Sequence, residues 1–334
     1  MAPPANRLAG LLFSSRNPLV MVVITIMTVI ALLGPRPSVE SEWVEPTLGP
    51  DLDAYLSENE RDVPALRPGD AKSVVWRDPG TRERTEVSIV YLHGFSADRH
   101  EVEPLITDLA RDLRANVYFT RLRGHGRDGS AMLEPSAADW LADTAEAIAI
   151  GGRIGEKVVL VATSTGGTLA LWAAAQEQAR GRLSALVLIS PNLGLRDKLA
   201  PVLLWPWGGV LARLVLGPER CFEPRNVYQA AHWTTCYPPG ALLPMMALVE
   251  HVKMIDLEVI EVPTLLIYSR EDEIVDAVET EHIIPTLRSG LVSTYLVEES
   301  GDPENHVLAG DAVSPGTTDQ VRARILATLE SRLR

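Results

Sequence analysis

The chain has 334 residues, of which 46% are hydrophobic and 22% charged, a balance that favours a folded globular protein over a disordered one. This length allows two domains of about 150 residues, or one α/β fold with an insertion. The formal net charge of −13 argues against a nucleic-acid partner, because phosphate backbones bind basic surfaces. Two cysteines, Cys221 and Cys236, are too few for a disulfide scaffold or a four-thiolate zinc site.

The first 34 residues differ in composition from the rest of the chain. Residues 18–34 are apolar apart from two threonines, and as a helix they would span about 25 Å, slightly less than the roughly 30 Å hydrocarbon core of a bilayer. We predict that residues 1–34 form an uncleaved membrane anchor. A cleaved secretory signal is the first alternative, although the run ends in Ala31-Leu-Leu-Gly34 rather than in a small-residue cleavage site, and a buried helix is the second.

Charge at the N-terminus predicts an orientation for this anchor. Residues 1–34 contain Arg7 and Arg16 and no acidic residue. Because positive charge stays on the cytoplasmic side, the predicted localisation is membrane-anchored, with the folded domain on the extracytoplasmic side. That location would permit a disulfide between Cys221 and Cys236, and two buried free thiols are the alternative that stays open.

Strand-like and helix-like segments alternate after an acidic, proline-containing linker at residues 35–50. This alternation predicts an α/β fold with a mostly parallel sheet covered by helices on both faces. Strands are expected at Lys72–Trp76, Glu86–Leu92, Val117–Thr120, Lys157–Ala162, Ala185–Ser190, Thr264–Tyr268 and Val292–Val297. Helices are expected at Asp51–Glu60, Glu101–Arg114, Ala137–Ile150, Thr165–Ala179 and Thr318–Leu333.

Residues 193–261 interrupt this alternation. They contain three tryptophans and both cysteines, and we interpret them as a cap inserted between two strands of a core formed by residues 51–192 and 262–334. Two apolar runs in the cap, Leu203–Trp207 and Leu242–Met246, have two interpretations. They could line an acyl pocket, since such pockets are mostly apolar, or they could form the cap's own hydrophobic core.

A predicted strand runs into Ser164 and continues directly into a predicted helix. The segment Ala162-Thr-Ser-Thr-Gly166 matches the G-x-S-x-G nucleophile elbow, with alanine in place of the first glycine. Small residues on both sides of the serine let the strand and helix approach each other, and the turn exposes the hydroxyl. Ser164 is therefore the candidate nucleophile, and a serine that only caps a helix is the alternative.

Serine needs a base to activate it, and in this type of fold the base follows the nucleophile in the chain. The histidines after Ser164 and outside the early cap are His251, His282 and His306. His306 follows the last predicted strand by a short loop, whereas the other two fall in the cap and in a helical segment. We therefore predict that His306 is the base.

The third member should be an acid that orients the base. Four carboxylates follow the strand Thr264–Tyr268 within a few residues, so chemistry alone leaves the choice open. We predict Asp272, because it follows the strand end closely and precedes an apolar pair that could return to the core. Glu271 and Asp276 are the alternatives.

A second strand end carries a glycine turn, His93-Gly94-Phe95. This turn could present the Phe95 amide to the same point as the Thr165 amide, and two such donors would bind the oxyanion of a tetrahedral intermediate. We expect His93 to fix this loop by packing and hydrogen bonding rather than to act in catalysis.

These motifs resemble the α/β-hydrolase superfamily, in particular the capped carboxylesterase and monoglyceride-lipase group that is often labelled serine aminopeptidase-like. The resemblance covers residues 51–334 and departs from the usual pattern at Ala162 and at Arg123, where these enzymes often have glycine and proline. The matching segments are Leu92-His-Gly-Phe95, Arg123-Gly-His-Gly126, Asp139-Trp140, Thr163-Ser-Thr-Gly-Gly167, Ser190-Pro191, Asp272 with Val275, and His306.

The resemblance implies a nucleophile at Ser164, an acid at Asp272, a base at His306 and oxyanion amides at Phe95 and Thr165. The implied reaction is hydrolysis of a lipophilic ester, such as an acylglycerol, through an acyl-serine and without a metal or organic cofactor. An acyltransferase, thioesterase or peptidase on the same fold is the first alternative. A non-catalytic ligand-binding protein is the second.

Overall fold

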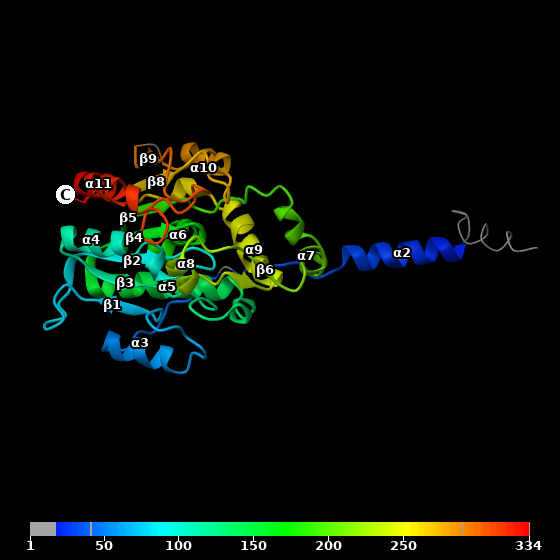
Figure 1. The fold of residues 1–334 in the computed structure, drawn as a ribbon, viewed down its shortest axis with the longest axis horizontal. Helices are drawn as coiled ribbons and strands as arrows, with labels where there is room; N and C mark the ends of the chain where they lie inside the picture. The colour runs from blue at the N-terminus through cyan, green and yellow to red at the C-terminus, as the bar shows by residue number, and fades with distance from the viewer. Residues whose placement is uncertain (1–17, 41, 289, 334) are drawn as a thin grey trace, which may run out of the picture.

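The computed structural model describes residues 18–40, 42–288 and 290–333. Within these residues, seven strands form one sheet: β1 (Ser73–Val75), β2 (Thr85–Leu92), β3 (Asn116–Phe119), β4 (Gly155–Thr163), β5 (Leu183–Ile189), β8 (Thr264–Tyr268) and β9 (Val292–Leu296). Their order across the sheet is β1-β3-β2-β4-β5-β8-β9 (Figure 1). β1 runs antiparallel to β3, and the other neighbouring pairs are parallel. The carboxyl ends of the parallel strands therefore lie along one edge of the sheet.

The sheet separates two hydrophobic cores, because successive side chains of a strand point to opposite faces. In β2, Val90 and Leu92 belong to the core under α5 (Ala137–Ile154) and α6 (Thr165–Ala175). Ile89 and Tyr91 belong to the opposite core, which α4 (Glu103–Leu113) and α11 (Pro315–Arg332) cover (Figure 1). The predicted fold class, a mostly parallel sheet with helices on both faces, is therefore confirmed.

Shorter helices complete the described part of the core. α3 (Leu52–Arg61) begins after Asp51, whose carboxylate accepts a hydrogen bond from the Ala54 amide at 3.1 Å, as an N-cap does. α10 (Ala277–Ile283) follows β8. Single turns of 3₁₀ helix are η1 (Arg99–Glu101), η2 (Gly129–Leu133), η3 (Glu177–Ala179), η4 (Ala200–Leu204), η5 (Pro239–Ala241), η6 (Leu257–Val259) and η7 (Ile284–Thr286).

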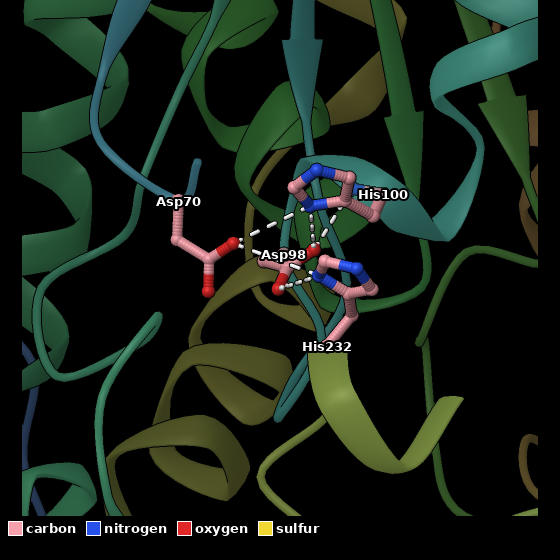
Figure 2. A group of neighbouring side chains, drawn as sticks. All are labelled: Asp70, Asp98, His100 and His232. Carbon is pink, nitrogen blue, oxygen red and sulfur yellow. Dashed lines mark hydrogen bonds and ion pairs between the residues drawn. The ribbon is translucent and has the colours of Figure 1, made fainter. Parts of the chain in front are cut away.

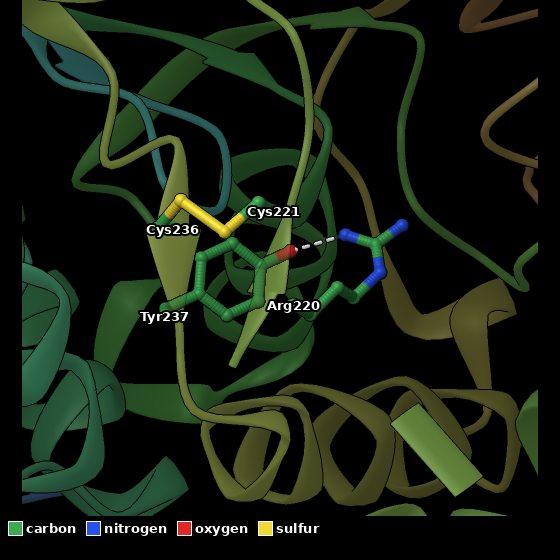
Figure 3. Close-up of a disulfide and its surroundings, with 4 residues drawn as sticks. All are labelled: Arg220, Cys221, Cys236 and Tyr237. Atoms are coloured by element: carbon green, nitrogen blue, oxygen red, sulfur yellow. Dashed lines mark hydrogen bonds between the residues drawn. A yellow bond between two sulfur atoms is a disulfide. The ribbon is translucent and has the colours of Figure 1, made fainter. Parts of the chain in front are cut away.

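Between β5 and β8 the chain leaves the sheet and forms the insertion. It contains α7 (Gly208–Leu216), α8 (Val227–His232) and α9 (Leu242–Lys253), together with a two-stranded antiparallel sheet of β6 (Arg220–Cys221) and β7 (Cys236–Tyr237). Cys221 and Cys236 are neighbours across this small sheet and form a disulfide (Figure 3). Beside it, the guanidinium of Arg220 donates a hydrogen bond to the hydroxyl of the buried Tyr237.

The N-terminal apolar segment corrects one sequence prediction. α2 (Pro18–Leu32) contains 15 residues, and at about 22 Å it is shorter than the roughly 30 Å core of a bilayer. In the part of the chain that the structure describes, the combination of length and apolar character that a membrane crossing needs is found in no helix. The predicted localisation, membrane-anchored through residues 18–34 with an extracytoplasmic domain, is therefore wrong. Arg7 and Arg16, which gave the predicted orientation, lie outside the described residues.

The disulfide allows a test of how the insertion is stabilised. Replacing both Cys221 and Cys236 by serine should lower the free energy of unfolding by about 3 kcal/mol. A cross-link over 15 residues restricts the unfolded chain, and the entropy that the unfolded chain loses in this way corresponds to that free energy. Urea unfolding followed by tryptophan fluorescence measures the loss, and the wild-type chain in a reductant should show the same shift. An unchanged midpoint in both would show that the cross-link contributes nothing to stability.

Candidate active site

Ser164 stands at a strained turn between β4 and α6. Its backbone angles, φ 53° and ψ −118°, lie in a region that residues with a side chain rarely adopt. The turn is tight because Gly166 packs directly on the end of β2: a Cβ atom there would lie 2.2 Å from the carbonyl oxygen of Leu92. The elbow that the sequence predicted is therefore present, and Ala162 fits it as a buried residue of β4.

The structure brings Ser164, His306 and Asp272 together from three separate loops. The Oγ of Ser164 lies 3.0 Å from Nε2 of His306, and Nδ1 of the same imidazole lies 2.8 Å from Oδ2 of Asp272. Ser164 follows β4, Asp272 follows β8 and His306 follows β9. This chain of hydrogen bonds is the arrangement that activates a serine hydroxyl through an oriented imidazole.

The geometry favours Asp272 over the two alternative acids. Asp272 is 1% exposed, and its second oxygen, Oδ1, accepts hydrogen bonds of 2.8 Å from the amides of Ile274 and Val275. Asp276 instead caps α10 and lies 2.8 Å from the ammonium of Lys198, whereas Glu271 is exposed. The prediction of Asp272 was based on the apolar pair Ile274-Val275 that follows it, and the amides of this same pair hold the Asp272 carboxylate.

Burial and charge act in opposite directions on His306. Burial alone lowers the pKa of its imidazole, since a charged ring loses its hydration. The charge and hydrogen bond of Asp272 outweigh this effect, with smaller contributions from Glu101 and Asp302, so the pKa of His306 is raised from its ordinary value of 6.5. The site thus stabilises the imidazolium that forms when Ser164 gives up its proton.

Two buried carboxylates that sequence reasoning missed hold the loops of the site. Asp302 accepts hydrogen bonds through Oδ2 from the amides of His306 and Val307, at 3.2 and 3.0 Å. Glu101 accepts through Oε2 from the amide of Gly94 and the hydroxyl of Tyr91, both at 2.9 Å, and burial raises the pKa of its carboxyl. Asp302 also forms an Asx turn, since its Oδ1 accepts a hydrogen bond of 3.2 Å from the Glu304 amide, and an Asp-Pro pair typical of such turns was the signal that could have revealed it.

The two candidate oxyanion donors belong to segments that adjoin Ser164. Thr165 begins α6, so its amide has no acceptor within the helix, and the positive end of the helix dipole lies there. The glycine turn that carries Phe95 passes close to Ser164, since a Cβ on Gly94 would lie only 3.2 Å from the Cβ of Ser164. The role of the Phe95 and Thr165 amides as an oxyanion hole stays a prediction.

His93 fixes the glycine turn, as the sequence predicted. It is fully buried, its Nδ1 lies 2.8 Å from the carbonyl oxygen of Gly94, and its Nε2 accepts a hydrogen bond of 3.0 Å from the Leu122 amide. Burial also lowers the pKa of His93, which keeps the ring neutral. The ring therefore ties the turn after β2 to the loop after β3.

The two apolar runs of the insertion pack into the main hydrophobic core. Leu203, Leu242 and the pair Met245-Met246 are buried there together with residues of α6. Trp205 and Trp207 are instead 59% and 39% exposed. Of the two interpretations of these runs, the structure favours a hydrophobic core that joins the insertion to the sheet domain. Phe95 meets this insertion directly, with its ring edge-on to Tyr237 at 5.3 Å between centroids.

Comparison with known proteins agrees with this fold. The family model described as serine aminopeptidase, S33, matches residues 83–300. The chain belongs to this hydrolase family. The matched range includes Ser164 and Asp272, and His306 lies just beyond it. A search of curated proteins found no match.

Solved structures share the fold of this family member at low sequence identity. A metagenome-derived lipolytic enzyme from a study of LipS and LipT is 22% identical, with a TM-score of 0.62 over 80% of this chain and 99% of that one. The monoacylglycerol lipase of Paleococcus ferrophilus is 16% identical, with a TM-score of 0.56 over 78% and 99% of the two chains. A soluble variant of the Saccharomyces cerevisiae monoglyceride lipase is 14% identical, with a TM-score of 0.54 over 77% and 91%.

The elbow gives a direct test of local packing. Gly166→Ala should destabilise the protein by about 1–3 kcal/mol, because the new Cβ meets the backbone of β2 at 2.2 Å and one side must move. Gly152→Ala is the matched control: the same change within α5 has nothing within 4 Å and should be neutral or stabilising by up to about 1 kcal/mol. Denaturant unfolding of both variants measures the difference, and equal stabilities would contradict the packing described for the elbow.

Proposed function

We propose that the protein is a serine hydrolase that cleaves lipophilic carboxylic esters, such as acylglycerols, through an acyl-serine intermediate. The observation that carries the proposal is the hydrogen-bonded series Ser164–His306–Asp272, with distances of 3.0 and 2.8 Å at the shared edge of the sheet. Burial of all three side chains removes competing water and strengthens their interactions.

In the proposed mechanism, Nε2 of His306 takes the proton of Ser164 while Oγ attacks the ester carbonyl carbon. Asp272 holds the ring so that Nδ1–H points toward its carboxylate, and it stabilises the imidazolium. The amides of Phe95 and Thr165 would hydrogen-bond the oxyanion. The imidazolium then protonates the departing alcohol and leaves an acyl-serine. A water molecule, deprotonated by His306, attacks the acyl-serine, and its breakdown releases the acid and restores Ser164.

Two features support a lipophilic ester as the substrate. The glycine turn beside Ser164 contacts the insertion through two aromatic rings, those of Phe95 and Tyr237. The named structural relatives that share the fold include two lipases of monoacylglycerols, so the fold accommodates such substrates in those proteins.

We further propose that the chain divides into domains as the sequence predicted. The core comprises residues 51–192 and 262–334, the cap comprises residues 193–261, and residues 35–50 form a linker.

Amide cleavage is the second candidate function, favoured by the description of the matching family as serine aminopeptidases. The same three side chains can serve either reaction, since both pass through a tetrahedral intermediate and an acyl-serine. Comparing p-nitrophenyl acyl esters with aminoacyl p-nitroanilides separates the two. Faster turnover of the anilides would replace the ester proposal with the peptidase one.

Ser164→Ala should lower kcat for p-nitrophenyl acyl esters by about 10⁶-fold, because no other group can take over the nucleophilic step. Its melting temperature should not fall, since alanine keeps the backbone and Cβ of the turn and the change removes only the hydroxyl that bonds His306. A fluorophosphonate probe should label the wild type and not this variant. Ser130→Ala, a change at an exposed serine outside the site, should keep both activity and labelling. Undiminished activity in Ser164→Ala would end the proposal.

The activity should fall as the pH drops, because only neutral His306 can accept the proton of Ser164. Since the pKa of His306 is raised, the midpoint of the acid limb of kcat/KM should lie above 6.5. A profile that stays flat well below this pH would contradict a histidine base.

Asp272→Asn removes the charge that raises the pKa of His306, so the acid limb should move to lower pH. The rate should also fall by about 10⁴-fold, because the imidazole loses its orienting acceptor. Asp276→Asn is the matched control in the same loop: it should leave both the midpoint and the rate unchanged, since Asp276 pairs with Lys198. Equal effects of the two changes would show that Asp272 has no special role.

A further inference from the structure

A second cluster of titratable side chains lies outside the Ser164 site. It consists of Asp70, Asp98, His100 and His232, and each offers one ligand atom within 4.8 Å of the others (Figure 2). Asp70 precedes β1, and His232 ends α8 of the insertion. Asp98 and His100 follow the glycine turn after β2. The cluster therefore joins three segments that are distant in sequence.

Four histidine-to-carboxylate distances within the cluster are close to those between ligands of one small ion. Zinc binds imidazole nitrogen and carboxylate oxygen at about 2.0–2.2 Å, so tetrahedral ligands lie about 3.3–3.6 Å apart. Nδ1 of His100 lies 3.3 Å from Oδ1 of Asp70 and 3.0 Å from Oδ1 of Asp98. Nδ1 of His232 lies 3.7 Å from Oδ1 of Asp70 and 3.6 Å from Oδ2 of Asp98.

Several polar atoms of this cluster are buried without a hydrogen-bond partner. Within the described ranges these are Oδ1 of Asp70, Oδ2 of Asp98 and Nδ1 of His232. The side chains of Asp70 and Asp98 are 0% and 1% exposed. Buried carboxylate and imidazole atoms without partners are costly, and all three atoms face the centre of the cluster (Figure 2). A cation bound there would satisfy them together.

The surroundings of the cluster match the outer shell of a metal site. Histidine ligands commonly donate their other ring N–H to a carboxylate, and Nε2 of His100 lies 3.3 Å from Oε2 of Glu103. The second oxygen of Asp70 accepts a hydrogen bond of 2.8 Å from Nε of Arg67. Both histidines therefore direct Nδ1 toward the carboxylates, and their rings stack with 3.8 Å between centroids.

We propose that Asp70, Asp98, His100 and His232 bind one divalent transition-metal ion, with Zn²⁺ as the best match. Two imidazoles favour zinc over magnesium or calcium, which prefer oxygen ligands alone. Four protein ligands make a closed, structural site rather than one that activates water. The ion would fix α8 of the insertion to the loop that carries Phe95, next to the hydrogen bond of 2.7 Å from the Thr234 amide to the Ser96 carbonyl.

An ion-pair network without metal is the competing account of the same residues. Burial lowers the pKa of His100, but the adjacent carboxylates of Asp70 and Asp98 outweigh this effect and raise it to about 9. A protonated His100, together with Arg67, could then balance the two carboxylates. The two accounts differ in whether zinc binds with fixed stoichiometry and in which residues it requires.

The test uses the full, untagged chain after chelator treatment, with ZnCl₂ as the probe and no substrate. Elemental analysis after gel filtration should find one zinc per wild-type chain, and added ZnCl₂ should raise the melting temperature. His232→Gln and His100→Gln should both lose the bound zinc and the rise in melting temperature. His251→Gln changes a histidine of the insertion outside the cluster and should keep both.

A third variant covers the case in which a ligand change prevents folding. Glu103→Gln keeps all four ligands and removes only the outer carboxylate, so zinc affinity should fall by about 10–100-fold while the protein remains folded. Absence of stoichiometric zinc in the wild type, or zinc binding that neither histidine change reduces, would overturn the proposal in favour of the ion-pair network. None of these readouts depends on hydrolytic activity.

Discussion

The arrangement of the site depends on how closely α6 approaches the end of β2. Gly166 allows this approach because it has no side chain to meet the Leu92 carbonyl. The approach forces Ser164 into a rarely adopted backbone conformation, and that conformation presents its hydroxyl to His306. The same proximity brings Gly94 against Ser164, so one packing contact positions both the candidate nucleophile and the candidate oxyanion turn.

The parallel arrangement of the strands brings the other loops of the site to the same edge of the sheet as Ser164. β2, β4, β5, β8 and β9 run in the same direction, so their following loops emerge at one edge. Buried carboxylates then fix these loops individually: Glu101 holds the turn after β2, and Asp302 holds the loop after β9. The sheet sets where the loops meet, and these side chain to backbone hydrogen bonds set how they are oriented.

The parts predictable from sequence are those with a local signature. Alternating apolar runs predicted the strands of the core, and β8 was predicted at Thr264–Tyr268, where it lies. Ser164 was visible because its elbow needs a short pattern of small residues, and His306 because it follows the last strand. The choice among the carboxylates after β8 required the three-dimensional structure, since Asp272 differs from the others in the backbone amides that bond it and in its contact with His306.

Features that depend on long-range contacts were not predictable in this way. Glu101 fell at the start of a predicted helix and Asp302 in a predicted loop, and neither position indicated burial, because burial is decided by segments far away in the chain. The cluster around Asp98 joins residues of the core to His232 of the insertion, a proximity that spacing cannot reveal. The N-terminal prediction failed because composition indicated an apolar run but not the shorter length of the helix that forms within it.

The disulfide has a topological consequence for proteolysis. α8 and the exposed side chain of Val227 lie within the stretch that the bond between Cys221 and Cys236 closes. A protease that cuts after Arg225 would therefore sever the backbone without releasing a fragment, since the covalent link keeps both pieces in one molecule. Such a nicked form would retain its mass on a denaturing gel until a thiol is added.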